Sequence, residues 1–327
     1  MVFLIGSHKD SWQPIMTAKT NTHSYWLNWR AFLCSIWILV SVMLSALLVW
    51  KYERLRKPAT NESGETQKET SATLYEDETW RPCLKGIHPA WLMSFRVVAF
   101  IALLVLLIFS SIVDGGNIFY YYTQWTFTLI TIYFGVDHVD GDAEKGIYDS
   151  SALPQSSNNP SDQEKSLGAS EVIVRQHAGI LGYIFQIIFQ INAGAVMLTD
   201  CVFWFIIVPF LTIKDYNLNF LIVIMHSINA VFLIGDTALN CLRFPWFRIG
   251  YFWLWAIIYV IFLWMVHACI NLWWPYPFLD LSSSYAPLWY FAGALFHIPC
   301  YGIFALLMKL KHHILSTRFP DSYQCAK

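Results

Sequence analysis

The 327-residue chain has the composition of a membrane protein. Hydrophobic residues fill 56% of its positions and charged residues only 13%, which is about half the charge usual in a soluble domain. The formal net charge of −1 gives no basis for nucleic-acid binding, which requires a basic surface. We therefore predict an integral membrane protein, of an endomembrane or the plasma membrane, whose surroundings are the lipid bilayer.

Seven apolar stretches are candidates for crossing a bilayer, which takes about 20 residues. The third is rich in Thr and Tyr and stops at Gly135, in an acidic run. The fold class that we expect is all-α: a multi-pass transmembrane helical bundle of about seven spans. The stretches are 31–50, 92–113, 118–136, 182–210, 217–239, 249–271 and 287–308.

Two polar connections interrupt the bundle. Both are rich in Ser, Thr, Glu, Asp, Pro and Asn, and a segment with so little to bury is expected to be flexible. The predicted organisation is a polar N-terminal segment (1–30), a first span (31–50), a flexible cytosolic loop (51–91), a six-span core (92–310) with a disordered cytosolic insert at 137–181, and a cytosolic tail (311–327).

The distribution of Lys and Arg predicts the orientation in the membrane. If the seven stretches all cross, one side holds 17 of the 21 basic residues, and the positively charged side is normally cytosolic. The C-terminus is then cytosolic and the N-terminus lumenal or extracellular. Asn61-Glu62-Ser63 is a formal glycosylation site, and on the cytosolic side it should carry no glycan.

The seven cysteines are scattered, without a Cys-x-x-Cys pair. Most fall inside apolar runs, where a free cysteine behaves as a small core residue. We expect neither a disulfide framework nor a zinc site, and no other metal or cofactor. The aromatic clusters at 119–125, 271–277 and 285–290 are typical of the belt at a membrane interface.

Polar residues form stripes on two of the predicted helices. At 100° per residue, the fifth stretch places His226 and Asp236 on one face, and the fourth does the same for Gln190 and Asp200. Such stripes face other helices or water, because unpaired polar groups in lipid are costly. The amides are expected to join helices. No Lys or Arg lies centrally in a span, so both carboxylates are expected to have a histidine partner, to be protonated or, for Asp236, to reach water.

Several reactive groups are predicted at one depth in the outer half of the bundle. Counting from the span ends at 1.5 Å per residue, Thr126, His226, Asp200 and His297 share a level, and His267 is shallower. A hydroxyl, an imidazole and a carboxylate suit a nucleophile, its base and a group that orients the base. The alternative is structural: a membrane histidine that only bridges backbone carbonyls.

Short motifs in order give a family resemblance. They are Trp-Thr-Phe at 125–127, Met-His-Ser at 225–227, Trp-Met-Val-His at 264–267 and Trp-Pro-Tyr-Pro-Phe-Leu at 274–279. Together they resemble the androgen-induced membrane protein family, whose wider group includes the insect rolling stone protein. The block at 78–96 is similar to plant members, which carry an extra N-terminal span.

The resemblance implies an intramembrane threonine hydrolase that cleaves fatty acid esters of hydroxy fatty acids or similar lipid esters. By motif, the nucleophile falls on Thr126 and the base on His226, with Asp200, His267 and His297 in support. The alternatives are a non-catalytic scaffold or a fusion or adhesion factor, a pathway for protons or small solutes, and haem held by two histidines. The sequence leaves the oligomeric state open.

Overall fold

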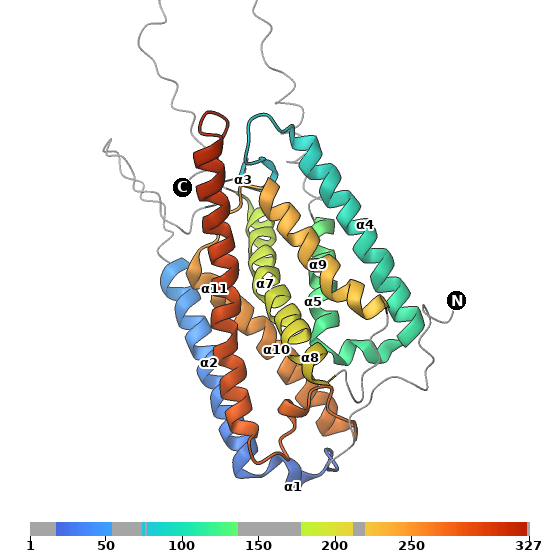
Figure 1. Cartoon of the computed structure of the whole chain (residues 1–327). Helices are drawn as coiled ribbons and strands as arrows, with labels where there is room; N and C mark the ends of the chain where they lie inside the picture. Colours follow the sequence, from blue (N-terminus) through green and yellow to red (C-terminus); the bar gives the residue numbers. More distant parts are fainter. Residues whose placement is uncertain (1–17, 54–73, 76, 137–177, 212–219, 326–327) are drawn as a thin grey trace, which may run out of the picture.

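The structure is a computed structural model in which the regular elements of the described residues are all helices (Figure 1). This confirms the predicted all-α bundle. The described residues are 18–53, 74–75, 77–136, 178–211 and 220–325.

Six helical segments in the described part of the chain are long and apolar enough to cross a membrane. They confirm a multi-pass integral membrane protein. They are α2 (Trp29–Glu53), α4 (Pro89–Asp114), α7 (Ile180–Val202) with the π-helix η3 (Phe203–Ile207), α9 (Phe220–Leu239), α10 (Ile249–Cys269) with the preceding turn η4 (Trp246–Arg248), and α11 (Ala286–Arg318).

The third predicted span forms a shorter helix, α5 (Tyr122–Val136), after the turn η2 (Gly116–Tyr120). Its 15 residues rise about 22 Å, less than the roughly 30 Å of a hydrocarbon core. One face is almost completely buried, and α5 packs against α4 and α7. It is therefore an interior helix of the bundle that does not reach spanning length.

The ends of α4 follow from local sequence signals. The His88 side chain caps the first turn by accepting a hydrogen bond from the Ala90 amide at 3.2 Å, and Pro89 suits the first helical position because it has no amide to satisfy. At the other end Gly115 takes φ +73°, a conformation that glycine adopts without steric cost. The short elements α1 (His23–Trp26), α3 (Asp77–Trp80), α8 (Val208–Leu211) and η5 (Pro277–Leu279) lie between the long helices.

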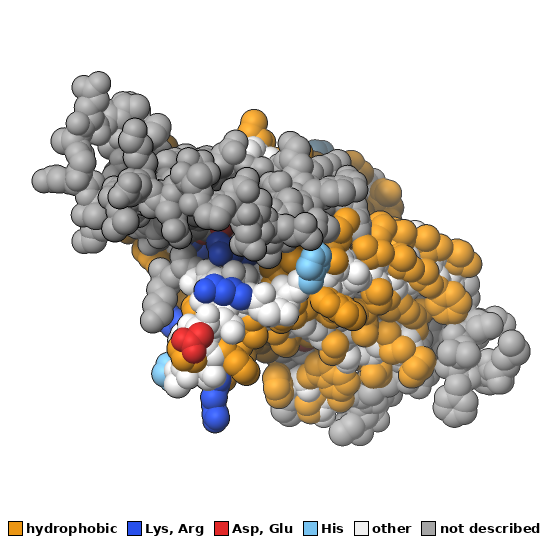
Figure 2. Space-filling model, turned by 90° about the horizontal axis from the view of Figure 1, so that it is seen from above, with side chains coloured by type: hydrophobic (Ala, Val, Ile, Leu, Met, Phe, Trp, Pro, Cys, Tyr) orange, Lys and Arg blue, Asp and Glu red, His pale blue; other side chains and the backbone are white. Residues whose placement is uncertain are grey.

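Helix α7 is central, with contacts to α5, α9, α10 and α11 (Figure 1). Its buried phenylalanines, such as Phe185 and Phe189, join a core that includes Phe127 and Phe304. The outward faces of α2 and α4 are apolar and exposed, as lipid-facing surfaces are. Figure 2, seen from the end where α4 begins, shows apolar side chains on the flank and charged ones gathered at that end.

The last part of the predicted flexible loop 51–91 is packed. Glu78, in α3, accepts a hydrogen bond from Arg243 Nε at 2.9 Å, and Leu74 and Cys83 are buried. Likewise, α11 continues to Arg318 through the first part of the predicted tail. Residues 54–73, including Asn61, and 137–177 of the predicted insert lie outside the described residues.

The prediction that the cysteines are small core residues without a disulfide is wrong for two of them, Cys241 and Cys325, whereas Cys83 is free and buried as expected. Cys241 and Cys325 form a disulfide, and the Sγ atoms of Cys83, Cys241 and Cys325 all lie within 4.8 Å of one another. They are far apart in the chain and meet only because the C-terminal tail folds back onto the start of α4 and the end of α9. The spacing of the cysteines in the sequence does not predict this contact.

Candidate functional site

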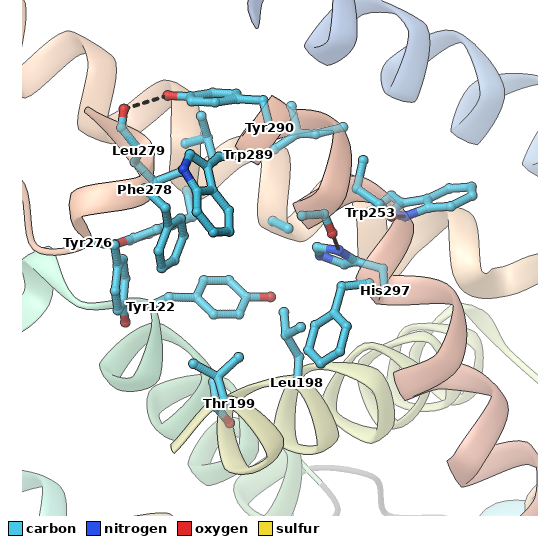
Figure 3. Close-up of a pocket in the computed structure, with 18 of the residues that line it drawn as sticks. Tyr122, Leu198, Thr199, Trp253, Tyr276, Phe278, Leu279, Trp289, Tyr290 and His297 are labelled. Atoms are coloured by element: carbon cyan, nitrogen blue, oxygen red, sulfur yellow. Dashed lines mark hydrogen bonds between the residues drawn. The ribbon is translucent and has the colours of Figure 1, made fainter. Parts of the chain in front are cut away.

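A cavity of about 220 Å³ lies inside the bundle, at the level where the reactive groups were predicted (Figure 3). Its walls are mainly apolar and aromatic and come from α2, α5, α7, η3, α9, α10, η5 and α11. Trp253, Trp289 and Phe278 are examples. The few polar side chains that line it include Tyr122, His226 and His297. An apolar site with a few converging polar groups is the usual form of a small-molecule or lipid site.

His226 is held between α7 and η3. Its Nδ1 lies 3.5 Å from Asp200 Oδ1, and its ring stacks on Phe203 with centroids 3.8 Å apart. The Trp204 indole donates a hydrogen bond to the His226 carbonyl at 3.1 Å. Both aromatic residues belong to the π-helix η3, so this wider turn is what brings them to His226. Asp200 therefore has a histidine beside it, as predicted, at a distance longer than a usual hydrogen bond.

Two hydrogen-bonding atoms face the cavity from opposite sides, the Tyr122 hydroxyl and the His297 imidazole (Figure 3). His297 Nδ1 lies 2.7 Å from the Gly293 carbonyl and donates to it, which leaves Nε2 as the nitrogen able to accept. Neither His297 Nε2 nor Tyr122 Oη has a hydrogen-bond partner within the described part of the chain. A ligand with a polar head can satisfy both.

Thr126 lies one helical turn beyond Tyr122 on α5. It is fully buried, and its hydroxyl donates to the Tyr122 carbonyl at 3.1 Å. Its side chain also neighbours the Tyr122 phenol. At this level α5 meets α9, where Gln124 Nε2 lies 3.8 Å from Met225 Sδ. Thr126 is thus outside the lining of the cavity, one turn beyond Tyr122, on a helix that contacts α9.

The predicted supporting residues differ in position. Asp200 lies beside His226 and His297 lines the cavity, whereas His267 is outside its lining. The His267 ring stacks on Trp274 at 3.8 Å, and its nitrogens lie 2.7 and 3.4 Å from the carbonyls of Leu263 and Trp273. This is the structural arrangement of a histidine that bridges backbone carbonyls.

Asp236 has a different partner from those predicted. Its Oδ1 lies 2.6 Å from Arg96 Nε, and its Oδ2 accepts hydrogen bonds from the Tyr133 hydroxyl and the Asn240 amide. Asp236 and Arg96 are both fully buried. The expectation of a histidine, protonation or water at Asp236 is therefore wrong, because Arg96, taken as a residue at the edge of its span, points into the bundle.

The predicted amide contacts are present. Gln186 and Gln190 donate to the Arg243 carbonyl at 3.2 and 3.0 Å, and Asn229 donates to Asp200 at 3.4 Å. Tyr122, expected from the sequence to belong to an aromatic belt, lines the cavity instead. Its spacing of four residues from Thr126, which puts both on one helix face, was the signal that could have found it.

No family model, curated protein or solved structure matches the chain.

Proposed function

We propose that this protein is an intramembrane hydrolase of lipid esters, with Thr126 as nucleophile and His226 as base. One observation carries the proposal: an apolar cavity within the bundle is lined by an imidazole that has a carboxylate at its Nδ1. An oriented imidazole next to a hydroxyl-bearing helix is the arrangement needed for nucleophilic catalysis.

The Asp200 carboxylate favours the His226 tautomer that carries its proton on Nδ1, which leaves Nε2 as the base. Nε2 takes the proton of Thr126 Oγ1 while Oγ1 bonds to the ester carbonyl carbon. The imidazolium then returns that proton to the departing alcohol, and the acyl group stays on the threonine. Water, activated by the same imidazole, releases the fatty acid and regenerates Thr126.

In the structure the Thr126 hydroxyl donates to the Tyr122 carbonyl. Threonine in a helix has two accessible χ1 rotamers, so rotation about one bond releases the hydroxyl toward the ester, and such catalytic contacts often close only when substrate binds. The Tyr122 hydroxyl, which points into the cavity (Figure 3), is the donor that we assign to the developing oxyanion.

The walls of the cavity favour a substrate with an acyl chain. Trp253, Trp289 and Phe278 offer no charge to a ligand, and the surrounding helices give direct contact with lipid. The resemblance to the androgen-induced membrane protein family supports fatty acid esters of hydroxy fatty acids as the first class to test.

The experiment is covalent labelling in membranes with a fluorophosphonate hydrolase probe. We expect wild type to label, and Thr126→Ala and His226→Ala to lose at least about 90% of the labelling, since a single triad member usually supplies several orders of magnitude in rate. Thr131→Ala is the matched control, because Thr131 is also buried in α5 and donates to the carbonyl four residues back, that of Phe127, at 2.7 Å.

Two results would count against the proposal. The first is the absence of labelling in well-folded wild type together with no turnover of lipid esters. The second is equal loss in Thr126→Ala and Thr131→Ala, which would indicate a packing role. Either result would favour the non-catalytic scaffold.

A further inference from the structure

The three-cysteine cluster lies outside the cavity and has no part in the proposed hydrolysis. Cys83 precedes α4, Cys241 follows α9, and Cys325 is in the C-terminal tail. All three are buried, and their Sγ atoms lie within 4.8 Å of one another. Three sulfurs bound to one zinc ion at 2.3 Å are about 3.8 Å apart in tetrahedral geometry, so small side-chain rotations would bring these three into place.

A positive charge and an oxygen donor lie against the sulfurs. The Lys311 ammonium donates to the Asn240 carbonyl at 2.5 Å and neighbours the Cys83 thiol. The same carbonyl accepts from Cys83 Sγ at 2.5 Å. Three thiolates and one Zn²⁺ have a net charge of −1, which the Lys311 ammonium neutralises. Buried charges are stable only when they are paired in this way.

Backbone contacts join the three segments around the cluster. The Cys83 amide donates to the Leu239 carbonyl at 2.7 Å, and the Gln324 amide donates to the Cys83 carbonyl at 3.1 Å. The isolated bridges Pro82–Asn240 and Leu84–Tyr323 lie on either side. The sulfurs are therefore at the centre of a joint in which each segment contributes one ligand, the arrangement of a structural metal site.

We propose that, when its disulfide is reduced, the cluster of Cys83, Cys241 and Cys325 binds one Zn²⁺ and fastens the C-terminal tail to the ends of α4 and α9. The Asn240 carbonyl or a water takes the fourth position. Thiolate is the ligand that zinc prefers in closed structural sites. The predicted cytosolic location of this end would keep the thiols reduced.

The disulfide form of the site is converted to the zinc-bound form in two steps, reduction and metal binding. A dithiol reductant gives two electrons and two protons to the Cys241–Cys325 bond and becomes a disulfide itself. Zn²⁺ then forms three Zn–S bonds while the three thiols release three protons to solvent. In the oxidised state only one thiol remains and the site cannot hold the ion.

The test is elemental analysis of the full-length protein, purified in detergent under thiol reductant from cells supplied with zinc. We expect about one zinc per chain in wild type, and little in Cys83→Ser, Cys241→Ser and Cys325→Ser. Cys269→Ser is the control, because Cys269 is free and exposed at the end of α10. Lys311→Met should weaken zinc affinity about tenfold, as removal of a residue beside the ligands typically does.

A second measurement needs only wild type and so does not depend on variants that fail to fold. Maleimide labelling under reductant, read by mass spectrometry, should spare the three cysteines until a chelator is added. Reduced, folded wild type without zinc would overturn the proposal, and so would unchanged zinc content in Cys83→Ser. A Cys241–Cys325 disulfide that persists in protein from cells whose free thiols were blocked before lysis would also overturn it.

Discussion

The Asp236 carboxylate connects three elements from a fully buried position. It pairs with Arg96 of α4 and accepts hydrogen bonds from Tyr133 of α5 and from Asn240. Removing one member of a buried ion pair leaves the other charge uncompensated, at a cost of about 3–5 kcal/mol. Asp236 is therefore a residue of the fold, and the idea of a proton or solute pathway through it loses its main support.

We predict that Asp236→Ala will lower stability by about 3–5 kcal/mol. The control is Asp77→Ala, which removes the partly exposed pair with Arg81 at 2.9 Å and should change stability by about 0.5 kcal/mol or less. The measurement is the apparent melting temperature of each purified variant in detergent. Equal melting temperatures for the two variants would mean that Arg96 finds another partner or water.

Asp200 acts, in the proposed mechanism, only through His226. Asp200→Asn keeps the size of the side chain but removes the charge that fixes the tautomer and stabilises the imidazolium. We expect fluorophosphonate labelling to slow by at least about tenfold, with no loss of the folded protein. Asp321→Asn, at an exposed carboxylate, is the control. Labelling of Asp200→Asn at the wild-type rate would remove Asp200 from the mechanism.

At the scale of helices, α7 and α10 can pack closely because Gly194 has no side chain. A Cβ atom placed on Gly194 would lie 2.7 Å from Phe252 Cε1, well inside van der Waals contact. Both residues are buried, so the ring has little room to move.

We predict that Gly194→Ala will destabilise the protein by about 1–3 kcal/mol, the usual cost of overpacking. Gly302→Ala, in α11, is the matched control. Nothing lies within 4 Å of its added Cβ, and it should be neutral or stabilise by up to about 1 kcal/mol. Thermal melting in detergent compares the two, and an unchanged melting temperature for Gly194→Ala would show that the helices can separate slightly.

The sequence could predict the elements that depend on local features, and it could not predict those that depend on contacts between distant segments. Long apolar runs locate the spanning helices, because hydrophobicity and length are local properties. The capped start of α4 at His88 and its end at Gly115 are local signals as well. The π-helix η3 is not, since it depends on the packing of Phe203 and Trp204 against His226, a contact between two helices.

The candidate site divides in the same way. Counting residues from span ends placed His226, Asp200 and His297 at one level, because helical rise is constant. Counting residues gives depth but not the direction in which a side chain points. It therefore could not predict that His267 contacts backbone carbonyls or that Arg96 pairs with Asp236. The contact between Cys83, Cys241 and Cys325 depends on how the C-terminal tail folds back, and no periodic pattern in the sequence predicts that.

At the scale of the whole molecule, basic residues gather at the end where α4 begins. The basic residues Arg81, Lys85, Arg243 and Lys311 belong to the segments that meet around the cysteine cluster, and Figure 2 shows charged side chains at that end. Positive charge is retained on the cytosolic side during insertion. The orientation predicted from the sequence places this end, and the C-terminus, in the cytosol.

Epitope tags at the two termini test that orientation in intact cells for a plasma-membrane pool, or in sealed microsomes for an endomembrane pool. We expect an antibody to reach the C-terminal tag from the cytosolic face and the N-terminal tag only from the opposite face. Asn61 should carry no glycan, so treatment with a glycosidase should leave the protein's mobility unchanged. Two tags on the same face would require an even number of crossings. That result would contradict the fold, in which α4 and α7 both begin at the end that holds the C-terminal tail, so that the chain returns through α5 between them.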